Sequence, residues 1–318
     1  MTTFHSHNID NERIPPELQN GVVAIGNFDG LHLGHRTIVD KTLAIARDNN
    51  CPSILLCFDP HPRTWFNPEN PVYLLTPPDM KSSLAAGLGI SAMAMHTFND
   101  AFSSLSADDF IVKILIEKLR ARHVVTGEDF HFGKKRQGTP EFLMKAGKAH
   151  DFSVTLMPPC RDESGKVISS SRIRKHLENG KLSKANELLG YPYQINGTVI
   201  TGQKIGRTLG FPTANLELPA NVRLRHGVYA VRVIRENGDR FDGVASFGRR
   251  PTFDNGKVLF ETYLFDFDEN LYGEEITIEL HEWQRDEEKF DNAEELVEQM
   301  MIDKKLARQF FSNLNQNS

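Results

Sequence analysis

The sequence predicts two domains: an N-terminal α/β domain with a parallel sheet (residues 1–187) and a C-terminal small antiparallel β-barrel with a terminal helix (residues 188–318). The first half alternates short apolar runs with longer segments of helical spacing, which is the pattern of βαβ units. Beyond residue 190 the chain consists mostly of strand-like runs separated by turn residues, which favours a small closed barrel. The apolar spacing over 292–311 is typical of an amphipathic helix packed on such a barrel.

Five short apolar runs predict the strands of the N-terminal sheet. They are residues 21–26, 53–58, 90–98, 123–127 and 153–157. The segments 35–49 and 107–121 between them carry apolar residues at helical spacing and predict helices. Because ligands of such sheets bind outside the carboxyl ends of the strands, the motifs that follow these strands are candidates for a functional site.

The C-terminal barrel is expected to follow a short helix over 182–189. Its strand-like runs are 228–234, 243–247, 258–267 and 274–280. Asn237-Gly238 lies between two of them and indicates a hairpin, and Asn255-Gly256 indicates a second turn. In the terminal helix we expect one packed face, made of Leu296, Val297, Met300, Met301 and Leu306.

The composition is that of an ordinary globular protein. Of 318 residues 39% are hydrophobic, and 37 basic against 42 acidic residues give a net charge of −5, which argues against a disordered chain and against broad nucleic-acid binding. Three cysteines without CxxC spacing argue against a disulfide framework and against a structural zinc site. With no apolar signal region and no apolar run of about 20 residues, we expect a cytoplasmic protein with neither a nucleic acid nor a membrane as partner, and we leave weak self-association open.

A glycine-rich motif, GNFDGLHLGHR (residues 26–36), directly follows the first predicted strand. Its glycines let the backbone approach a bulky ligand, and the next helix offers free N–H groups to phosphates. His32 and His35 would share one face of the first helical turn and donate hydrogen bonds to phosphate oxygens; two surface histidines on a glycine-rich turn are the alternative. Asn27 and Asp29 would either fix the loop or hold a polar group of the ligand. The residues expected to line a nucleotide pocket are Gly26, Asn27, Phe28, Asp29 and Gly34.

Three further segments could converge on the same edge of the sheet. They are FDPHPR (58–63), GEDFHFGKKRQG (127–138) and ISSSRIRKHL (168–177). Taken alone, Ser169, Ser170 and Ser171 are most simply a helix N-cap, and Arg172 and Arg174 are most simply solvated charge. Together with the histidines they would form a polyphosphate cage, because guanidinium matches phosphate geometry and keeps its charge.

A second constellation, GTVITGQKIGRTLGFPTANL (197–216), lies at the start of the barrel. Its glycines and basic residues suggest a flexible loop that closes over phosphates, although it is not a Walker A motif. Within PTAN an extended chain puts Thr213 and Asn215 on one side, and their oxygens suit Mg²⁺ shared with ATP; a turn with ordinary side-chain capping is the alternative. The expected phosphate-binding residues are Gly202, Lys204, Gly206, Arg207, Thr213 and Asn215.

Glu261 lies within the apolar run VLFETYLFDF. Burial would raise the pKa of this carboxylate and would make it a general base for an alcohol, which is worth roughly 10²–10⁴ in rate. An exposed place on an edge strand is the alternative.

In order along the chain stand GNFDGLHLGHR, FDPHPR, GEDFHFG, ISSSRIR, GRTLGFPTANL, GVYAV, RRPTF and a glutamate near DFDENLYG. This set resembles the bacterial bifunctional riboflavin kinase/FAD synthetase family over about residues 20–312. The resemblance implies a Rossmann-like nucleotidyltransferase domain followed by a barrel of the riboflavin kinase type. It also implies two ATP-dependent reactions: the barrel phosphorylates riboflavin to FMN and releases ADP, and the N-terminal domain joins FMN to the AMP part of ATP, giving FAD and pyrophosphate.

For the kinase reaction the resemblance implies that Thr213 and Asn215 bind Mg-ATP and that Glu261 deprotonates the ribityl 5′-hydroxyl. Two positions depart from the family pattern: Tyr263 replaces a frequent histidine, and Phe247 stands where an isoleucine is usual. These changes bear on flavin positioning and not on the class of reaction.

For the adenylyl transfer the resemblance implies that His32 and His35 contact the ATP phosphates and that Gly26–Asp29 line the nucleotide pocket. His131 stands where the family often has an arginine, which removes a permanent charge from that loop. The residues that would brace the triphosphate are Ser170, Ser171 and Arg174.

Two other functions are alternatives to this one. Another HxGH nucleotidyltransferase, or a relative of the class I aminoacyl-tRNA synthetases, would leave PTAN and Glu261 without a role, and the chain has no KMSKS-like segment. A flavin carrier that binds without turnover would need neither a metal ligand nor a base.

Overall fold

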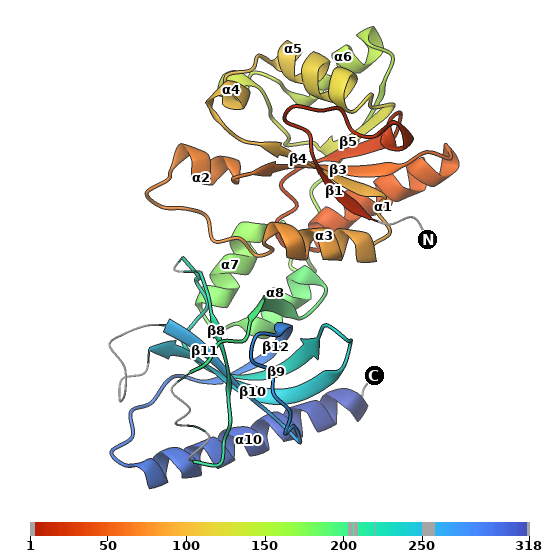
Figure 1. Ribbon diagram of the computed structural model, residues 1–318. Helices are drawn as coiled ribbons and strands as arrows, with labels where there is room; N and C mark the ends of the chain where they lie inside the picture. Colours follow the sequence, from red (N-terminus) through yellow and green to blue (C-terminus); the bar gives the residue numbers. More distant parts are fainter. Residues whose placement is uncertain (1–3, 203–205, 207–208, 220, 250–257, 317–318) are drawn as a thin grey trace. The chain divides into compact units, whose positions relative to one another are not determined.

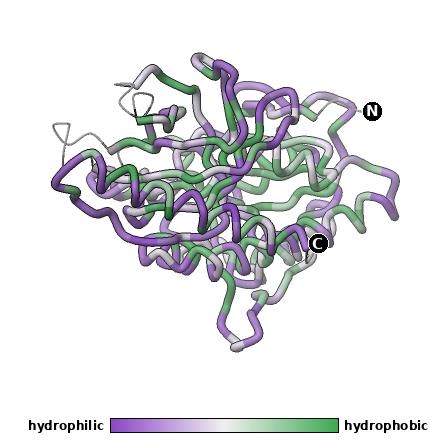
Figure 2. The backbone as a smooth tube through the Cα atoms, turned by 90° about the horizontal axis from the view of Figure 1, so that it is seen from below, coloured by the Kyte–Doolittle hydropathy of each residue, from purple (hydrophilic) through white to green (hydrophobic). Residues whose placement is uncertain are grey.

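The computed structural model describes residues 4–202, 206, 209–219, 221–249 and 258–316. Its backbone contacts divide the chain into two compact units, Met1–Ser170 and Ser171–Ser318, called here the N-terminal and C-terminal units (Figure 1). In Figure 2 many of the inner segments of the backbone tube are coloured as hydrophobic, and many of the outer loops are coloured as hydrophilic. In the described part of the chain no helix has both the length and the apolar character needed to cross a membrane.

The sheet of the N-terminal unit is parallel throughout, with strand order β1-β4-β3-β2-β5-β6. Its strands are β1 (His5–Asn8), β2 (Val22–Ile25), β3 (Ser53–Asp59), β4 (Ala92–Thr97), β5 (His123–Gly127) and β6 (Ser153–Met157). The five predicted strands are confirmed. The sequence does not predict β1, because HSHN contains no apolar residue and the strand lies at an edge.

Helices cover both faces of this sheet. They are α1 (Leu33–Asp48), α2 (Pro62–Phe66), α3 (Pro78–Gly87), α4 (Asp100–Ser103), α5 (Ala107–Asp109), a π-helix (Phe110–Lys118) and α6 (Pro140–Ala149), with single 3₁₀ turns at Pro16–Leu18 and Lys134–Arg136. Alternate residues of β2 enter different cores: Val23 packs with Phe110 of the π-helix, and Ala24 packs with Val39 of α1. The two predicted helices are therefore present, the second wound mainly as a π-helix.

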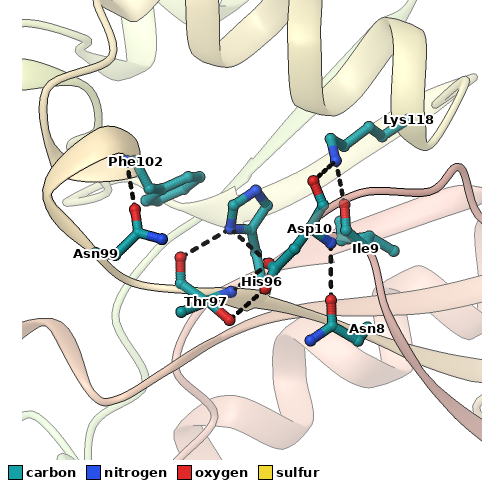
Figure 3. A network of polar contacts seen from close by, with 8 residues as sticks. All are labelled: Asn8, Ile9, Asp10, His96, Thr97, Asn99, Phe102 and Lys118. Atoms are coloured by element: carbon teal, nitrogen blue, oxygen red, sulfur yellow. Dashed lines mark hydrogen bonds and ion pairs between the residues drawn. The ribbon is translucent and has the colours of Figure 1, made fainter.

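A polar network fastens the end of β1 to β4 (Figure 3). Asp10 accepts hydrogen bonds from the amide of Thr97 at 2.7 Å and from the Thr97 hydroxyl, and its carboxylate lies 3.3 Å from Nδ1 of His96. Lys118 donates to the carbonyl oxygens of Ile9 and Asp10. Burial alone would raise the pKa of Asp10, but the hydrogen bonds from Thr97 outweigh it and lower the pKa. Side-chain hydrogen bonds thus hold a polar edge strand in place.

The sheet of the C-terminal unit is antiparallel, with strand order β7-β12-β9-β10-β11-β8. Its strands are β7 (Tyr193–Thr198), β8 (Ala214–Glu217), β9 (Gly227–Arg235), β10 (Arg240–Arg249), β11 (Val258–Leu264) and β12 (Glu275–Arg285). The two edges meet where the amide of Ile200 donates to the carbonyl oxygen of Asn215 at 2.9 Å, so the sheet forms a nearly closed barrel. The four predicted strands and the hairpin at Asn237-Gly238 are confirmed. The second predicted turn, Asn255-Gly256, lies outside the described residues.

The terminal helix α10 (Ala293–Gln316) lies along this sheet (Figure 1), with a packed face that differs from the predicted one. Asp303 and Phe311 are buried, whereas Met301 and Leu306, which the sequence assigns to the packed face, are 55% and 47% exposed. The prediction is wrong for these two residues because a charged residue occupies the packed stripe. The carboxylate of Asp303 accepts hydrogen bonds from the guanidinium of Arg285 at 2.8 and 2.6 Å. Because Asp303 is charged, the spacing of apolar residues does not identify it as a buried position.

Two helices, α7 (Ser170–Glu178) and α8 (Leu182–Leu189), precede the barrel. The sequence predicts α8 over the same residues, and this is confirmed. The side chain of Asn186 accepts a hydrogen bond from the amide of Tyr193 at 2.8 Å and donates to the carbonyl oxygen of Leu280 at 3.0 Å. Helix α8 is therefore bonded to β7 and β12; the domain boundary after residue 187 stays a prediction.

Candidate active sites

The glycine-rich loop between β2 and α1 is folded around the buried side chains of Phe28 and Asp29. The carboxylate of Asp29 accepts a hydrogen bond from the amide of Thr76 at 3.1 Å, and the Thr76 hydroxyl accepts one from the amide of Gly30 at 2.8 Å. Gly30 has φ of +86°, in the region that favours glycine. Gly26 lies against the ring of Phe28, where a Cβ would come within 3.3 Å. Of the two roles foreseen for Asp29, these contacts support fixing the loop.

His32 and His35 lie together at the start of α1. Their rings stack with centroids 3.7 Å apart and planes inclined by 15°. His32 caps the helix, because its Nδ1 accepts a hydrogen bond from the amide of His35 at 3.2 Å; a neutral His32 therefore carries its proton on Nε2, as a donor. His32 is 4% exposed and the Nδ1 atom of His35 is sealed from solvent, so neither ring is that of an ordinary surface histidine.

The start of α7 reaches the same loop. The hydroxyl of Ser170 donates to the carbonyl oxygen of Asp29 at 2.8 Å. Gly34 packs tightly against this segment, since a Cβ on it would lie 3.3 Å from the carbonyl oxygen of Ile168 and 3.1 Å from the ring of His32. The serine segment and the HxGH motif, remote in sequence, are therefore neighbours in the fold.

The roles of the predicted site residues all stay predictions, and four of these residues are not placed beside either site by the structure. Ser171 and Arg174 belong to α7 beyond the division between the two units. Lys204 and Arg207 lie outside the described residues.

A buried lysine, which the sequence analysis does not single out, supports the loop. Lys81 of α3 is 5% exposed, and its ammonium donates to the carbonyl oxygen of Asn27 at 2.8 Å. The Oδ1 atom of Asn27 and the Nδ1 atom of His35 are buried, with no hydrogen-bond partner in the described part of the chain. The signal that could have revealed Lys81 is its place four residues before Ala85, which is buried, on the apolar face of its helix.

We expect the N-terminal unit to lose stability as the pH falls below about 6.5. Burial, together with the charges of His32 and Lys81, holds the pKa of His35 well below its ordinary value. At low pH the unfolded chain therefore binds a proton at His35 that the folded chain does not bind. The contribution of His35 to the unfolding free energy is complete above the pKa of the unfolded state. It declines as the pH drops through that pKa, by at most about 1.4 kcal/mol per pH unit.

Urea unfolding at about pH 7.5 and pH 5.5 checks this expectation. The difference in unfolding free energy between the two pH values should shrink by about 1 kcal/mol in His35→Asn. It should stay unchanged in His131→Asn, which replaces an exposed histidine. The same pH effect in the wild type and in His35→Asn would contradict the assignment.

A cavity of about 450 Å³ opens in the C-terminal unit between the barrel and the start of α10. Its wall contains three of the predicted residues, Gly206, Thr213 and Glu261. Phe211 and Tyr263 also line it, with ring centroids 5.0 Å apart in an edge-to-face arrangement. The volume is within the range found for small-molecule sites.

Strand register brings PTAN opposite Glu261. Glu261 of β11 pairs with Asn215 of β8 on one side and with Ser246 of β10 on the other, so it lies on an interior strand, half-buried, and the edge-strand alternative is wrong. Asn215 is 3% exposed, and its Nδ2 donates to the carbonyl oxygen of Thr213 at 3.2 Å. Gly202 lies against this amide, where a Cβ would come within 2.6 Å of Nδ2.

The oxygen atoms of this segment fit a hard cation. The Oδ1 atom of Asn215 is buried and accepts no hydrogen bond from the described residues; leaving such an acceptor unsatisfied costs about 1–3 kcal/mol. The hydroxyl of Thr213 stands two residues away, and Mg²⁺ takes oxygen ligands of these kinds. The described residues contain no group of three or more His, Cys, Asp or Glu side chains suited to a metal.

The charged residues of the cavity are missed by sequence reasoning. The ion pair of Arg285 with Asp303 lines it, as does Glu287. The carboxylate of Glu287 lies 3.3 Å from Nδ1 of His226 and directly against Gly248, where a Cβ would overlap it. A glycine inside a strand marks such close approaches, so Gly248 was the available signal.

Both halves of the chain are similar to known protein families. The FAD synthetase family matches residues 14–172, and the riboflavin kinase family matches residues 189–311. A bifunctional riboflavin kinase/FMN adenylyltransferase of Listeria monocytogenes is 40% identical over 93% of this chain and 94% of its own. The protein of that name from Escherichia coli K12 is 36% identical over 91% and 92%. A solved structure described as a macrolide-efflux protein from Streptococcus pneumoniae has a TM-score of 0.84 and 31% identity, covering 95% of this chain and 98% of its own.

These similarities extend over nearly the whole chain and include both units. They confirm the predicted fold class, a parallel α/β domain followed by an antiparallel barrel with a terminal helix, and the predicted pair of transferase activities. The chain belongs to the bifunctional riboflavin kinase/FMN adenylyltransferase family.

Proposed function

We propose that the chain makes FAD from riboflavin in two ATP-dependent reactions, one in each unit. Riboflavin is phosphorylated to FMN at the cavity of the C-terminal unit, with release of ADP. FMN is adenylylated beside the glycine-rich loop of the N-terminal unit, with release of pyrophosphate. The observation that carries the proposal is the pairing of Glu261 with Asn215 beside a cavity lined by Thr213. A proton acceptor next to two oxygen ligands is what phosphoryl transfer to an alcohol requires.

In the kinase reaction Glu261 takes the proton of the ribityl 5′-hydroxyl while the hydroxyl oxygen attacks the γ-phosphorus of ATP and ADP leaves. Thr213 and Asn215 hold Mg²⁺, which when bound neutralises charge on the ATP phosphates. The rings of Phe211 and Tyr263 offer aromatic surface to the flavin. The residues proposed to bind phosphates before this segment are Gly202, Lys204, Gly206 and Arg207.

In the adenylyl transfer a phosphate oxygen of FMN attacks the α-phosphorus of ATP, so no side chain has to remove a proton. His32 and His35 lie at the N-terminus of α1, where backbone N–H groups favour phosphate, and they donate to phosphate oxygens. Near the carboxyl ends of β3 and β4 the rings of Phe58, Phe98 and Phe102 lie 5.3 to 6.3 Å apart and offer a surface for the flavin ring. The residues proposed to contact the triphosphate are Ser170, Ser171 and Arg174.

Purified protein incubated with riboflavin, ATP and Mg²⁺, with the flavins separated over time, tests the proposal. We expect FMN to appear first and FAD to follow. A nucleotidyltransferase for another acceptor would leave riboflavin unchanged, and a flavin carrier would bind it without converting it. Absence of both products would reject the proposed function.

A further inference from the structure

The N-terminal unit holds a buried positive charge that the reaction described above does not use. Lys81 lies on α3 and is 5% exposed. An ammonium has three N–H donors, and the bond to the carbonyl oxygen of Asn27 at 2.8 Å is the only one that Lys81 makes to the described residues. Within the same residues no carboxylate lies at ion-pair distance from it. A buried charge without a counterion is costly, so its presence needs a reason.

Two polar atoms near Lys81 also lack hydrogen-bond partners among the described residues. The Nδ1 atom of His35 is buried without a partner among the described residues, and so is the Oδ1 atom of Asn27. Lys81 is close enough to His35 to help lower the pKa of that ring, after burial and His32. The carboxylate of the loop, that of Asp29, accepts hydrogen bonds from the amide and the hydroxyl of Thr76. Lys81 therefore places one positive charge behind the GNFDG loop (residues 26–30), where a phosphate chain would supply the missing negative charge.

We propose that Lys81 is a positioning residue for adenylyl transfer, a fixed positive charge that holds the GNFDG loop through the Asn27 carbonyl and offsets the charge that develops on departing pyrophosphate. This inference rests on the proposed function of the N-terminal unit. In the step, the bond from an FMN phosphate oxygen to the α-phosphorus forms, and the bond from the α-phosphorus to the bridging oxygen breaks. The electron pair goes to pyrophosphate, and the ammonium keeps its proton throughout.

Three substitutions separate charge from hydrogen bonding. Lys81→Gln keeps an N–H donor for Asn27 but has no charge, Lys81→Met removes both, and Lys81→Arg keeps the charge. Lys148→Met, an exposed lysine of α6, is the matched control. The measurements are kcat and KM for ATP in FAD formation from FMN, with riboflavin phosphorylation followed in the same samples.

We expect kcat for FAD formation to fall roughly 10²-fold in Lys81→Gln and Lys81→Met, while KM for ATP changes less than about threefold, because the charge acts as the leaving group departs. The kcat of Lys81→Arg should be about tenfold higher than that of Lys81→Met, because arginine restores the positive charge. Riboflavin phosphorylation should stay at the wild-type rate in every variant, and the Lys148→Met control should match the wild type in both reactions.

Thermal unfolding without ligand distinguishes this role from a structural one. Lys81→Met should unfold no earlier than the wild type, because an apolar side chain of similar length replaces an unpaired charge; a lysine that only supports the fold predicts earlier unfolding. The proposal is overturned by a kcat of Lys81→Gln within about twofold of the wild type, or by earlier unfolding of Lys81→Met that Lys81→Arg does not correct. A folded wild type that forms no FAD from FMN would reject the proposed function and, with it, the role of Lys81.

Discussion

The Glu261→Gln variant is expected to lose riboflavin phosphorylation by roughly 10²–10⁴-fold and to keep forming FAD from supplied FMN. Glutamine preserves the size of the side chain and one acceptor oxygen but cannot accept the proton of the ribityl hydroxyl. The loss should appear mainly in kcat, because proton removal belongs to the transition state and not to substrate binding. It should be confined to one reaction, because Glu261 lies on an interior strand of the barrel, in the C-terminal unit.

Initial rates of FMN formation from riboflavin and of FAD formation from FMN check this prediction. Glu275→Gln, which changes an exposed glutamate of β12, is the control and should phosphorylate riboflavin at the wild-type rate. Equal loss of both activities in Glu261→Gln would show that the two reactions are not divided between the units as proposed. An unchanged kinase rate would remove Glu261 from the role of proton acceptor.

The parallel sheet is predictable from sequence because its inner strands are buried on both faces and read as continuous apolar runs. The edge strand β1 has no such run, and its attachment depends on Asp10, Thr97 and Lys118, which are far apart along the chain. Lys81 escapes notice for a related reason. Sequence shows a lysine in a helical segment, and only the packing of α3 against the glycine-rich loop reveals that its ammonium is buried beside Asn27.

In the barrel, local chemistry predicts the Asn237-Gly238 hairpin, but no local pattern places β8 beside β11. The pairing of Asn215 with Glu261 follows from that long-range strand order. Their residue types and motifs identify both as candidates, while their meeting at one cavity is a property of the fold. The packed face of α10 depends in the same way on Asp303 finding Arg285 across the unit.

Asn215→Leu is expected to lower riboflavin phosphorylation by about 10²-fold or more and to raise the Mg²⁺ concentration needed for half-maximal rate. The Oδ1 atom of Asn215 is buried and has no hydrogen-bond donor among the described residues. Coordination of a cation would explain why this oxygen is buried without a donor. Leucine has a similar size and no polar atom. Among the described residues, the only side-chain hydrogen bond lost is the one from Nδ2 to the Thr213 carbonyl. The ligand-free protein should therefore keep its unfolding free energy to within about 1 kcal/mol.

Titration of the kinase rate with Mg²⁺ separates a metal ligand from a packing residue. Asn215→Asp keeps an oxygen ligand and should need less Mg²⁺ than Asn215→Leu, since Mg²⁺ is commonly bound through carboxylates. Asn196→Leu, at an exposed position of β7, should follow the wild-type titration. If Asn215→Leu were equally slow at every Mg²⁺ concentration and Asn215→Asp no better, the side chain would act by shape and the metal site would have to lie elsewhere. If instead the loss of kinase rate in Asn215→Leu becomes smaller as the Mg²⁺ concentration rises, and the ligand-free variant is as stable as the wild type, then the missing Oδ1 atom belongs to the metal site.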